Sequence, residues 1–457
     1  MTGRIAFVPP RFGPGVVGGA EAVCREAALG LAARGWDVEV LTTCAIDHYT
    51  WANDLPEGVT DEEGLVVRRW KMVHDATRAG LRAQRQIERG ELPTLDEQIS
   101  WISLRFQVPG LFHEILRHGD RYDAIVFAPY MFWTSTVCLP VVAERGVAMP
   151  CLHDETYARL DVVRPVLADA AAVWFLSEPE HGLAHRLGPV APRHRVIGAG
   201  VDVPASYDAS GFRARHGLGR PFVLYAGRRE PDKGWPWLLE TYARAVALGG
   251  VDVDLVTAGV GEVTVPAAAA GRVIDLGFLP DVERDDAFAA AAACVQPSRM
   301  ESFSRTTMES WLASTPVLAV EQSEVVAWHC ERSGGGVTFH DEFDLAECLR
   351  WLLAAPLEAA EMAARGRKYV IDNYAWPVVL DRMEEDLTAL QAARGGAAGG
   401  RGGVGVAGRG RVGVSGSGGG GVSGSGGGGV SGSGGGGVSG SGRGGVSGSG
   451  GGGVSGS

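Results

Sequence analysis

Residues 293–309 read ACVQPSRMESFSRTTME, and this stretch decides the fold. Its first four residues form a short apolar run typical of a buried strand, and a helix is predicted to open near Ser302 to Ser304. Glu301 and Glu309 stand on either side of that opening. A helix N-terminus offers free N–H groups and partial positive charge to a phosphate, and carboxylates accept hydrogen bonds from sugar hydroxyls. The stretch therefore predicts a sugar-nucleotide site, although a solvent-facing helix with two ordinary acids has the same pattern.

A second loop in the same half of the chain carries two cations. Residues 225–234 read YAGRREPDKG, after an apolar run and before a predicted helix at about 234–248. Gly227 permits a tight turn, and Arg228 and Lys233 can converge on one anion across it. A surface loop with two solvated cations is the alternative.

Two further turns follow predicted strands. Gly259 comes after the strand at 253–256, where close approach of the backbone to a nucleotide is expected. Phe278 comes after the strand at 272–276 and is expected to line the pocket of the base. A simple turn explains each of these positions equally well.

The first half of the chain supplies fewer signals. Gly18 and Gly19 open a predicted helix at about 20–34, and the N–H groups there are expected to face a diphosphate. His153 follows a predicted strand at 147–152, where it could hydrogen-bond a sugar hydroxyl. A lone histidine is more often structural, and its place at a strand end counts against that alternative.

Predicted strands and helices alternate, and the pattern restarts near residue 206, which indicates an α/β fold. We expect two doubly wound, Rossmann-like domains that face each other across a cleft. The tail repeats VSGSGGGG, and one valine in such a repeat cannot build a core. The expected parts are an N-terminal acceptor-side domain, a C-terminal nucleotide-sugar-binding domain, a helix crossing back to the first domain and a disordered Gly/Ser tail, at 1–205, 206–375, 376–394 and 395–457.

The composition limits the class of protein. The chain has 457 residues and is 45% hydrophobic, which is enough for two cores. A net charge of −12 without basic runs argues against a nucleic-acid-binding protein. The 7 cysteines include no Cys-x-x-Cys pair, so we expect reduced core residues and no structural zinc site. No signal peptide and no apolar run of about 20 residues is recognised, which predicts a soluble, cytoplasmic protein.

Taken together, these motifs resemble the retaining glycosyltransferases of family 4, the group 1 glycosyl transferases of the GT-B fold. The resemblance covers about residues 3–390. Each motif is weak alone, but all of them occur in order and at the expected strand ends. The matching pieces are Gly18-Gly19-Ala20-Glu21, His153-Asp154, Gly200-Val201-Asp202, Gly227-Arg228 with Lys233-Gly234, Gly259-Val260-Gly261 and Glu301 with Glu309.

The resemblance implies a reaction and roles. A sugar would move from a nucleoside diphosphate to an acceptor hydroxyl with retained configuration, by departure and attack on one face, in polysaccharide or glycolipid assembly. Arg228 and Lys233 would neutralise the donor diphosphate, Glu301 would hold sugar hydroxyls, Glu309 would bind the ribose, and His153 would contact the sugar. The predicted catalytic residues are Arg228, Lys233, Glu301 and His153. The other predicted donor-binding positions are Gly19, Gly259, Phe278, Ser302, Phe303 and Ser304.

No cofactor and no metal ion is expected, because two cationic side chains replace the metal. An Asp-x-Asp pattern at Asp252 and Asp254 falls within a predicted strand and is not placed to bind one. Several positions depart from the family pattern: Arg229 stands where leucine is common, and Ser302, Ser304 and Arg305 replace Gly, Gly and Leu. Arg305 could contact an unusual donor or acceptor group or point to solvent.

Three alternatives stay open. A sugar-nucleotide-binding protein without turnover would keep the same binding residues, and a phosphorylase or sugar-phosphate synthase could use the same fold. A Gly-x-Gly-x-x-Gly pattern at Gly13, Gly15 and Gly18 suggests an NAD-dependent oxidoreductase, but no acid follows the second strand to bind a ribose.

One more pattern concerns location. Four arginines recur at helical spacing and could give weak peripheral contact with the inner face of the cell membrane, or a solvated helix face: Arg78, Arg82, Arg85 and Arg89.

Overall fold

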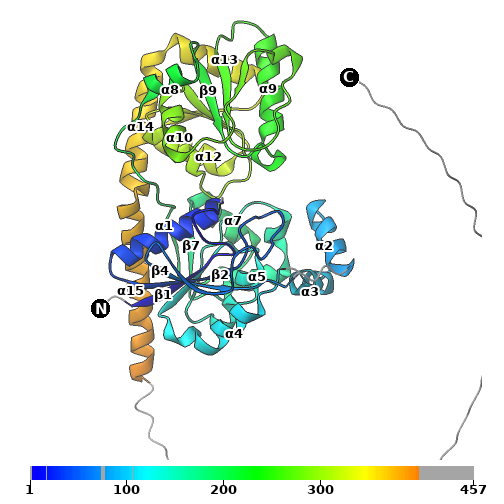
Figure 1. The fold of residues 1–457 in the computed structure, drawn as a ribbon, viewed down its shortest axis with the longest axis vertical. Helices are drawn as coiled ribbons and strands as arrows, with labels where there is room; N and C mark the ends of the chain where they lie inside the picture. Colours follow the sequence, from blue (N-terminus) through cyan, green and yellow to red (C-terminus); the bar gives the residue numbers. More distant parts are fainter. Residues whose placement is uncertain (1–2, 17, 74–77, 105, 401–457) are drawn as a thin grey trace, which may run out of the picture. The chain divides into compact units, whose positions relative to one another are not determined.

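Two sheets with helices around them organise the described part of the chain (Figure 1). The computed structural model describes residues 3–400, except 17, 74–77 and 105. Residues up to Gly402 belong to one compact unit, and the second unit is Gly403–Ser457. Of the tail predicted to be disordered, residues 395–400 continue the last helix, and residues 401–457 lie outside the described residues.

The first sheet has eight strands in the spatial order β3-β4-β2-β1-β5-β6-β7-β8. Every pairing is parallel except that of β3 with β4. Strands β5 and β7 are buried along their whole length, which is why they read as continuous apolar runs. The strands are β1 (Arg4–Val8), β2 (Asp37–Thr43), β3 (Gly58–Glu62), β4 (Leu65–Trp70), β5 (Ala124–Phe127), β6 (Gly146–Ala148), β7 (Ala172–Phe175) and β8 (His194–Val196).

Helices connect these strands. The α-helices are α1 (Gly19–Ala33), α2 (Arg78–Glu88), α3 (Leu95–Leu104), α4 (Pro109–His118), α5 (Trp133–Thr136), α6 (Arg164–Ala168) and α7 (Glu178–Leu187). Short 3-10 turns are η1 (Gly119–Arg121), η2 (Leu139–Val142), η3 (Thr156–Arg159) and η4 (Asp161–Val163).

The second sheet has six strands, all parallel, in the spatial order β11-β10-β9-β12-β13-β14. They are β9 (Phe222–Ala226), β10 (Asp254–Ala258), β11 (Val273–Asp275), β12 (Ala293–Gln296), β13 (Val317–Val320) and β14 (Gly336–Phe339). Around them lie α8 (Ala209–Arg215), η5 (Pro231–Lys233), α9 (Trp235–Ala247), η6 (Ala267–Ala269), α10 (Asp281–Ala290), α11 (Arg305–Leu312), α12 (Glu324–Ser333), α13 (Glu342–Ala354) and α14 (Pro356–Tyr374).

Both sheets are doubly wound, as expected from the sequence. In each, the chain builds strands to one side of the first strand and then returns to the other side. The order therefore reverses between β1 and β5 in the first sheet, and between β9 and β12 in the second. Ligands of open α/β sheets bind outside the carboxyl ends of the strands at such reversals.

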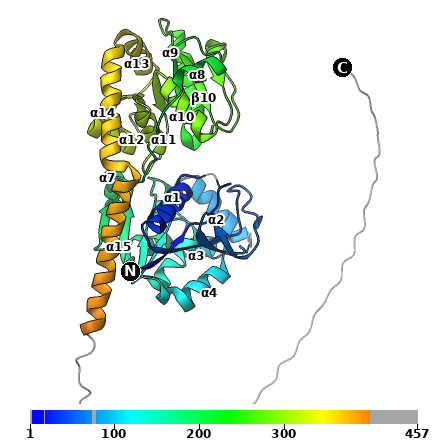
Figure 2. The same ribbon diagram turned by 60° about the vertical axis from the view of Figure 1, so that its left-hand side comes forward.

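The last helix, α15 (Trp376–Gly400), packs against α1 of the first sheet (Figure 2). Arg34 pairs with Asp381 at 2.6 Å, and the Trp36 indole nitrogen donates to Glu384 at 2.9 Å. A Cβ at Gly30 would lie 2.6 Å from Leu380 Cδ1, so the leucine packs closely over this glycine. The last described helix is thereby joined to the first helix.

The structure corrects two details of the predicted elements. The predicted strand at 147–152 ends at Ala148, because Pro150 and a left-handed Cys151 (φ 53°) interrupt it. Strands β3 and β14 were not predicted. The first is a largely polar antiparallel edge strand, and the second is a half-buried edge strand without a continuous apolar run.

Candidate active site

Lys233 and Glu301 meet where the second sheet reverses its strand order. Lys233 ends η5, which follows β9, and Glu301 lies between β12 and α11. The Lys233 ammonium lies 2.8 Å from Glu301 Oε1, and the two side chains are 32% and 12% exposed. Gly234 adopts φ 72° and passes so close to the Pro297 backbone that a Cβ would not fit. This close approach holds the two loops together.

The environment keeps Glu301 ionised. Burial by itself raises the pKa of the carboxyl, but the charge of Lys233 and hydrogen bonds from Lys233 and Ser298 outweigh burial, and the net pKa is lowered. His153 contributes a smaller lowering of the same pKa. Glu301 is therefore a hydrogen-bond acceptor only, as a group that holds hydroxyls must be.

Arg228 lies at the end of β9 with its guanidinium about one-third exposed. Its Nη1 is 3.0 Å from Glu230 Oε2 and 3.0 Å from His48 Nε2. Burial and the charge of Arg228 lower the pKa of His48, so the imidazole accepts this hydrogen bond in its neutral form. Sequence reasoning missed His48, because nothing in its local sequence distinguishes it. The predicted contact of Arg228 with a diphosphate would replace the Glu230 pair.

Arg229, which departs from the family pattern, has a structural position. Its side chain is 2% exposed, and it donates to Thr257 Oγ1 at 3.1 Å and to the Gly261 carbonyl at 3.0 Å. It also pairs with Asp275. Arg229 thus joins the carboxyl ends of β10 and β11 to the turn that follows β10. Gly259 lies close against the Gly227 backbone with φ 146°, and its predicted approach to a nucleotide stays a prediction.

The turn before α11 explains why glycine is common there in the family. Ser304 adopts the left-handed conformation, φ 70°, immediately before the helix. Its hydroxyl accepts from Gln296 Nε2 at 3.0 Å and lies 3.0 Å from Thr307 Oγ1, and these bonds accompany a strained backbone. Ser302 is buried, and the Phe303 ring packs against His329 and Tyr374. Only backbone groups of Phe303 could therefore face a ligand.

Glu309 lies on α11 beside two arginines. Arg284 Nη2 is 3.4 Å away and Arg305 Nε is 3.9 Å away. Arg305 Nη1 also lies 2.8 Å from Glu26 on α1, so Arg305 links the two sheets' helices instead of pointing to solvent. Burial raises the pKa of Glu26, and Arg305 partly opposes that rise.

The N-terminal candidates occupy two loops of the first sheet. Gly19 begins α1 at the reversal between β1 and β5, and a Cβ there would meet nothing within 4 Å. Gly18 lies against the buried pair of Arg11 and Glu21, whose atoms are 2.6 Å apart. The Arg11–Glu21 pair therefore supports this loop at Gly18, while space remains beside Gly19.

His153 lies five residues beyond the end of β6, not directly after a strand. It is one-third exposed, with Nδ1 3.7 Å from Glu155. The loop is held by Glu180 of α7, which accepts from the backbone N–H groups of Leu152 and Leu176. Burial raises the pKa of Glu180 to about 8 although these N–H groups oppose the rise. Sequence reasoning missed Glu180, because its partner Leu152 lies 28 positions away in the sequence.

The matches to known proteins agree with this geometry. Residues 220–355, which carry β9 to α13, match the family model described as glycosyl transferases group 1. A D-inositol 3-phosphate glycosyltransferase from Rhodococcus erythropolis is 25% identical over 82% of this chain and 87% of its own length. A 2-deoxystreptamine glucosyltransferase from Streptomyces kanamyceticus is 29% identical over 48% of this chain and 56% of its own length.

The chain is a glycosyltransferase, and its residues 220–355 match the group 1 glycosyl transferases. Solved structures show the same GT-B fold. Sucrose-phosphate synthase from Thermosynechococcus elongatus superposes with a TM-score of 0.63 at 21% identity, covering 86% of this chain and 100% of its own. Anabaena HepE in complex with UDP-glucose superposes with a TM-score of 0.60 at 18% identity, covering 85% and 100%. The recognised family and the GT-B fold are confirmed, and the oxidoreductase alternative is not.

Phe278 of the glycosyltransferase is 64% exposed, beyond β11. An exposed aromatic ring at a strand end can stack on a base, so its predicted contact with the nucleotide stays a prediction. A cavity of about 880 Å³ lies elsewhere, between α7 and α12, and Glu178, Gly182, Glu324 and Trp328 are among its lining residues. The predicted donor residues do not line it.

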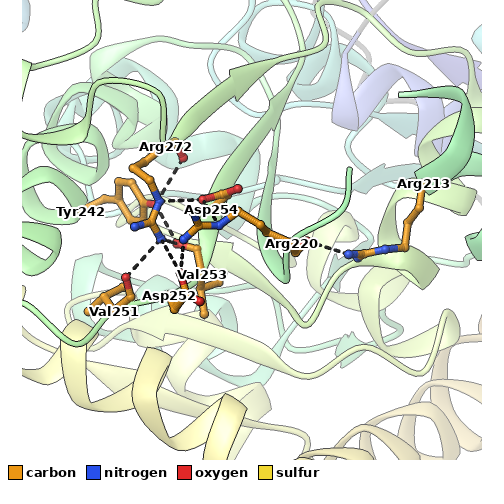
Figure 3. A network of polar contacts seen from close by, with 8 residues as sticks. All are labelled: Arg213, Arg220, Tyr242, Val251, Asp252, Val253, Asp254 and Arg272. Atoms are coloured by element: carbon orange, nitrogen blue, oxygen red, sulfur yellow. Dashed lines mark hydrogen bonds and ion pairs between the residues drawn. The ribbon is translucent and has the colours of Figure 1, made fainter. Parts of the chain in front are cut away.

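Both carboxylates of the Asp-x-Asp pattern form ion pairs with arginines, as Figure 3 shows. Asp254 opens β10 and lies 2.7 Å from Arg272 Nε, while Asp252 pairs with Arg220. Arg272 also donates to the Val251 and Val253 carbonyls at 3.1 Å each. These carboxylates therefore lie at the amino end of the strand, opposite to Lys233 and Glu301.

Two of the four arginines predicted to contact a membrane form exposed ion pairs. Arg82 lies 3.7 Å from Glu97, and Arg89, just beyond α2, lies 2.8 Å from Glu91. The Arg78 side chain lies outside the described residues. Within residues that the structure describes, no helix has the length and apolar character to cross a bilayer. Membrane contact of the glycosyltransferase stays a prediction.

Proposed function

We propose that the glycosyltransferase moves a sugar from a nucleoside-diphosphate sugar to an acceptor hydroxyl, with retention of configuration and without a metal ion. The bond between the anomeric carbon and the diphosphate oxygen breaks, and a bond to the acceptor oxygen forms on the same face. The acceptor proton passes to the departing diphosphate, so charge balances without a covalent intermediate on the protein.

The observation that carries this proposal is the Lys233–Glu301 pair at the strand reversal. It places a cation and an ionised carboxylate side by side, both partly exposed, where α/β sheets bind ligands. The cation suits a departing diphosphate and the carboxylate suits sugar hydroxyls. Lys233 exchanges part of its contact with Glu301 for a phosphate oxygen when donor binds.

The other groups complete the donor site. Arg228 leaves Glu230 for the diphosphate, and fixed cations of this kind contribute about 3–4 kcal/mol to transition-state stabilisation. Glu309 accepts from the ribose, and Phe278 stacks on the base. Backbone N–H groups near Gly19, Ser302 and Ser304 point at phosphate oxygens, and His153 donates to a sugar hydroxyl.

The same geometry supports cations in place of a metal. Asp252 and Asp254 are committed to Arg220 and Arg272, so we assign neither of them to a catalytic metal. Turnover should persist in excess chelator. A requirement for Mg²⁺ or Mn²⁺ in turnover would refute this part of the proposal.

For the acceptor, the named relatives suggest a cyclitol or a phosphorylated polyol, built into a glycoconjugate. The relatives include D-inositol 3-phosphate glycosyltransferases and a 2-deoxystreptamine glucosyltransferase. D-inositol 3-phosphate and 2-deoxystreptamine are therefore the first acceptors to try, each with UDP-, GDP-, ADP- and dTDP-linked sugars. The anomeric configuration of any product, read by NMR, tests retention.

The decisive experiment is thermal stabilisation by UDP, GDP, ADP and dTDP. A ligand at 100 times its dissociation constant adds about 2.7 kcal/mol of stability. One diphosphate should stabilise the protein and lose this effect in Lys233→Ala. Lys368→Ala is the matched control, because Lys368 forms an exposed ion pair with Asp372 on α14. Equal stabilisation of both variants would refute the role of Lys233. Binding without turnover on any acceptor would favour a non-catalytic binding protein.

A further inference from the structure

Three histidines from two elements of the first sheet lie together, and none of them is assigned to the donor. His181 and His185 lie on α7, and His194 opens β8. The three rings have centroid separations of 4.6, 5.0 and 5.2 Å. One ring nitrogen of each lies within 4.8 Å of the others, and the Nε2 atoms of His181 and His185 are 3.0 Å apart.

The backbone brings these rings together. His181 and His185 are four positions apart on a helix, so they lie on the same face one turn apart. β8 pairs with β7 in parallel, and the register sets His194 beside Val173 at the start of the strand. The His181 ring also packs on Phe175, 5.2 Å between centroids, at the end of β7. The grouping is thus fixed by regular elements.

Outer partners orient two of the rings. His194 Nδ1 lies 2.8 Å from the Ala191 carbonyl, which can only accept, so Nδ1 carries the proton and Nε2 keeps its lone pair. His181 Nδ1 lies 3.5 Å from Glu178 Oε2, which favours the same tautomer. Histidine ligands of metal ions are typically held in this way, by a carbonyl or a carboxylate on the far nitrogen.

The neighbouring cations are already paired. Arg186 lies 2.9 Å from Glu324, and Arg193 lies 3.3 Å from Asp386. Their charges are therefore offset by carboxylates, while Glu178 adds a negative charge beside His181. The local charge favours a bound cation.

We propose that His181, His185 and His194 bind a divalent transition-metal ion of the zinc class. Three imidazole nitrogens and one open position suit Zn²⁺ or Co²⁺, whereas Mg²⁺ prefers oxygen ligands. The ion joins α7 to β8 and stabilises this edge of the first sheet. The site does not depend on the proposed function, because none of its ligands is assigned to the donor or to the chemistry.

The test uses full-length, untagged protein stripped with chelator. Co²⁺ titration should give visible d–d absorption that saturates at one equivalent, and Zn²⁺ should displace it and raise Tm, while Mg²⁺ should do neither. His185→Ala and His194→Ala, both at exposed side chains, should lose the stoichiometric signal and the Tm rise. His340→Ala is the matched control, because His340 is an exposed histidine that also has a carboxylate partner, Glu321.

A positioning variant separates a metal site from a surface cluster that binds by chance. Glu178→Gln should keep the one-equivalent stoichiometry and weaken Co²⁺ affinity about tenfold, as outer partners of ligating histidines typically do. No binding to the unmodified protein would overturn the proposal. Binding that is unchanged in both His185→Ala and His194→Ala would overturn it too, because the ion would then lie elsewhere.

Discussion

The two ends of the second sheet use charge in opposite ways. At the amino end of β10, Asp254 is buried and contacts Arg272 at 2.7 Å and Arg220 at 3.5 Å (Figure 3). At the carboxyl ends of β9 and β12, Lys233 and Glu301 form one pair that is partly exposed. The first network has its partners within the fold, and the second can exchange a partner for a ligand.

The same residue types are therefore structural at one end of a strand and functional at the other end. A buried carboxylate held by two arginine partners is hardly accessible to a metal or a sugar. A single lysine–carboxylate pair at a strand reversal keeps donors and acceptors available. Charged motifs in an α/β sheet should therefore be judged by strand end as well as by pattern.

The largest expected effect is at the carboxyl end. Lys233→Ala should lower turnover by about 10²–10³-fold, because it removes a cation from the departing diphosphate. Stability should change by less than about 1 kcal/mol, since the pair is partly exposed. Steady-state kinetics and urea unfolding measure the two quantities. Near-normal turnover would contradict the functional half of the comparison.

The amino end should show the reverse. Asp254→Ala should cost about 3 kcal/mol of stability, because it leaves Arg272 without its buried partner. Turnover of the remaining folded protein should be close to normal. Urea unfolding with an activity assay at low temperature checks this. A loss of donor binding larger than the folded fraction explains would show that the network serves the site.

Arg229 tests whether a charged side chain is functional because of the strand end that it occupies or because it is free to contact a ligand. It lies at the carboxyl end, yet it is buried and bonded to Thr257, Gly261 and Asp275. Arg229→Leu, the common family residue, should cost about 1–2 kcal/mol of stability, because the Thr257 and Gly261 partners lose their donor. Donor affinity should stay nearly constant. A large loss of affinity without a loss of stability would mean that Arg229 contacts the donor.

The pH dependence sharpens the role of the pair. Lys233 lowers the pKa of Glu301, whereas burial alone would raise it. Lys233→Ala should therefore move the acidic limb of the turnover profile to higher pH. The stabilising effect of the pair is present above the ordinary carboxyl pKa of 4.5 and is lost as pH falls through the lowered pKa. The stability difference between the two proteins should narrow in acid, and an unchanged limb would exclude Glu301 as its source.

The smallest effect is expected for the C-terminal repeat, which belongs to neither end of the second sheet. Removing residues 401–457 should leave turnover and Tm nearly unchanged, because a Gly/Ser repeat with isolated valines cannot add a core. Parallel assays of the full and shortened chains check this. A large drop in either quantity would show that the repeat takes part in folding or in the reaction.

Much of the fold could be predicted because buried parallel strands are continuous apolar runs. Strands β9 and β12 were recognised in this way, and the reversal of strand order then places the candidate site. The errors have local causes. β3 is polar and antiparallel, and the run after Ala148 looks like strand until Pro150 and Cys151 turn the chain.

The α/β class and the resemblance to the group 1 glycosyltransferases could be recognised from the sequence, as could one cationic loop and one acidic loop of the predicted donor site. These depend on local periodicity and on short motifs, which the amino-acid order contains directly. Which charged side chains remain free to contact a ligand depends on tertiary packing. Arg228 and Arg229 are adjacent, yet one is partly exposed and the other is buried among three partners. The tertiary structure also decided that His181, His185 and His194 meet, because contacts between elements depend on packing that no local pattern encodes.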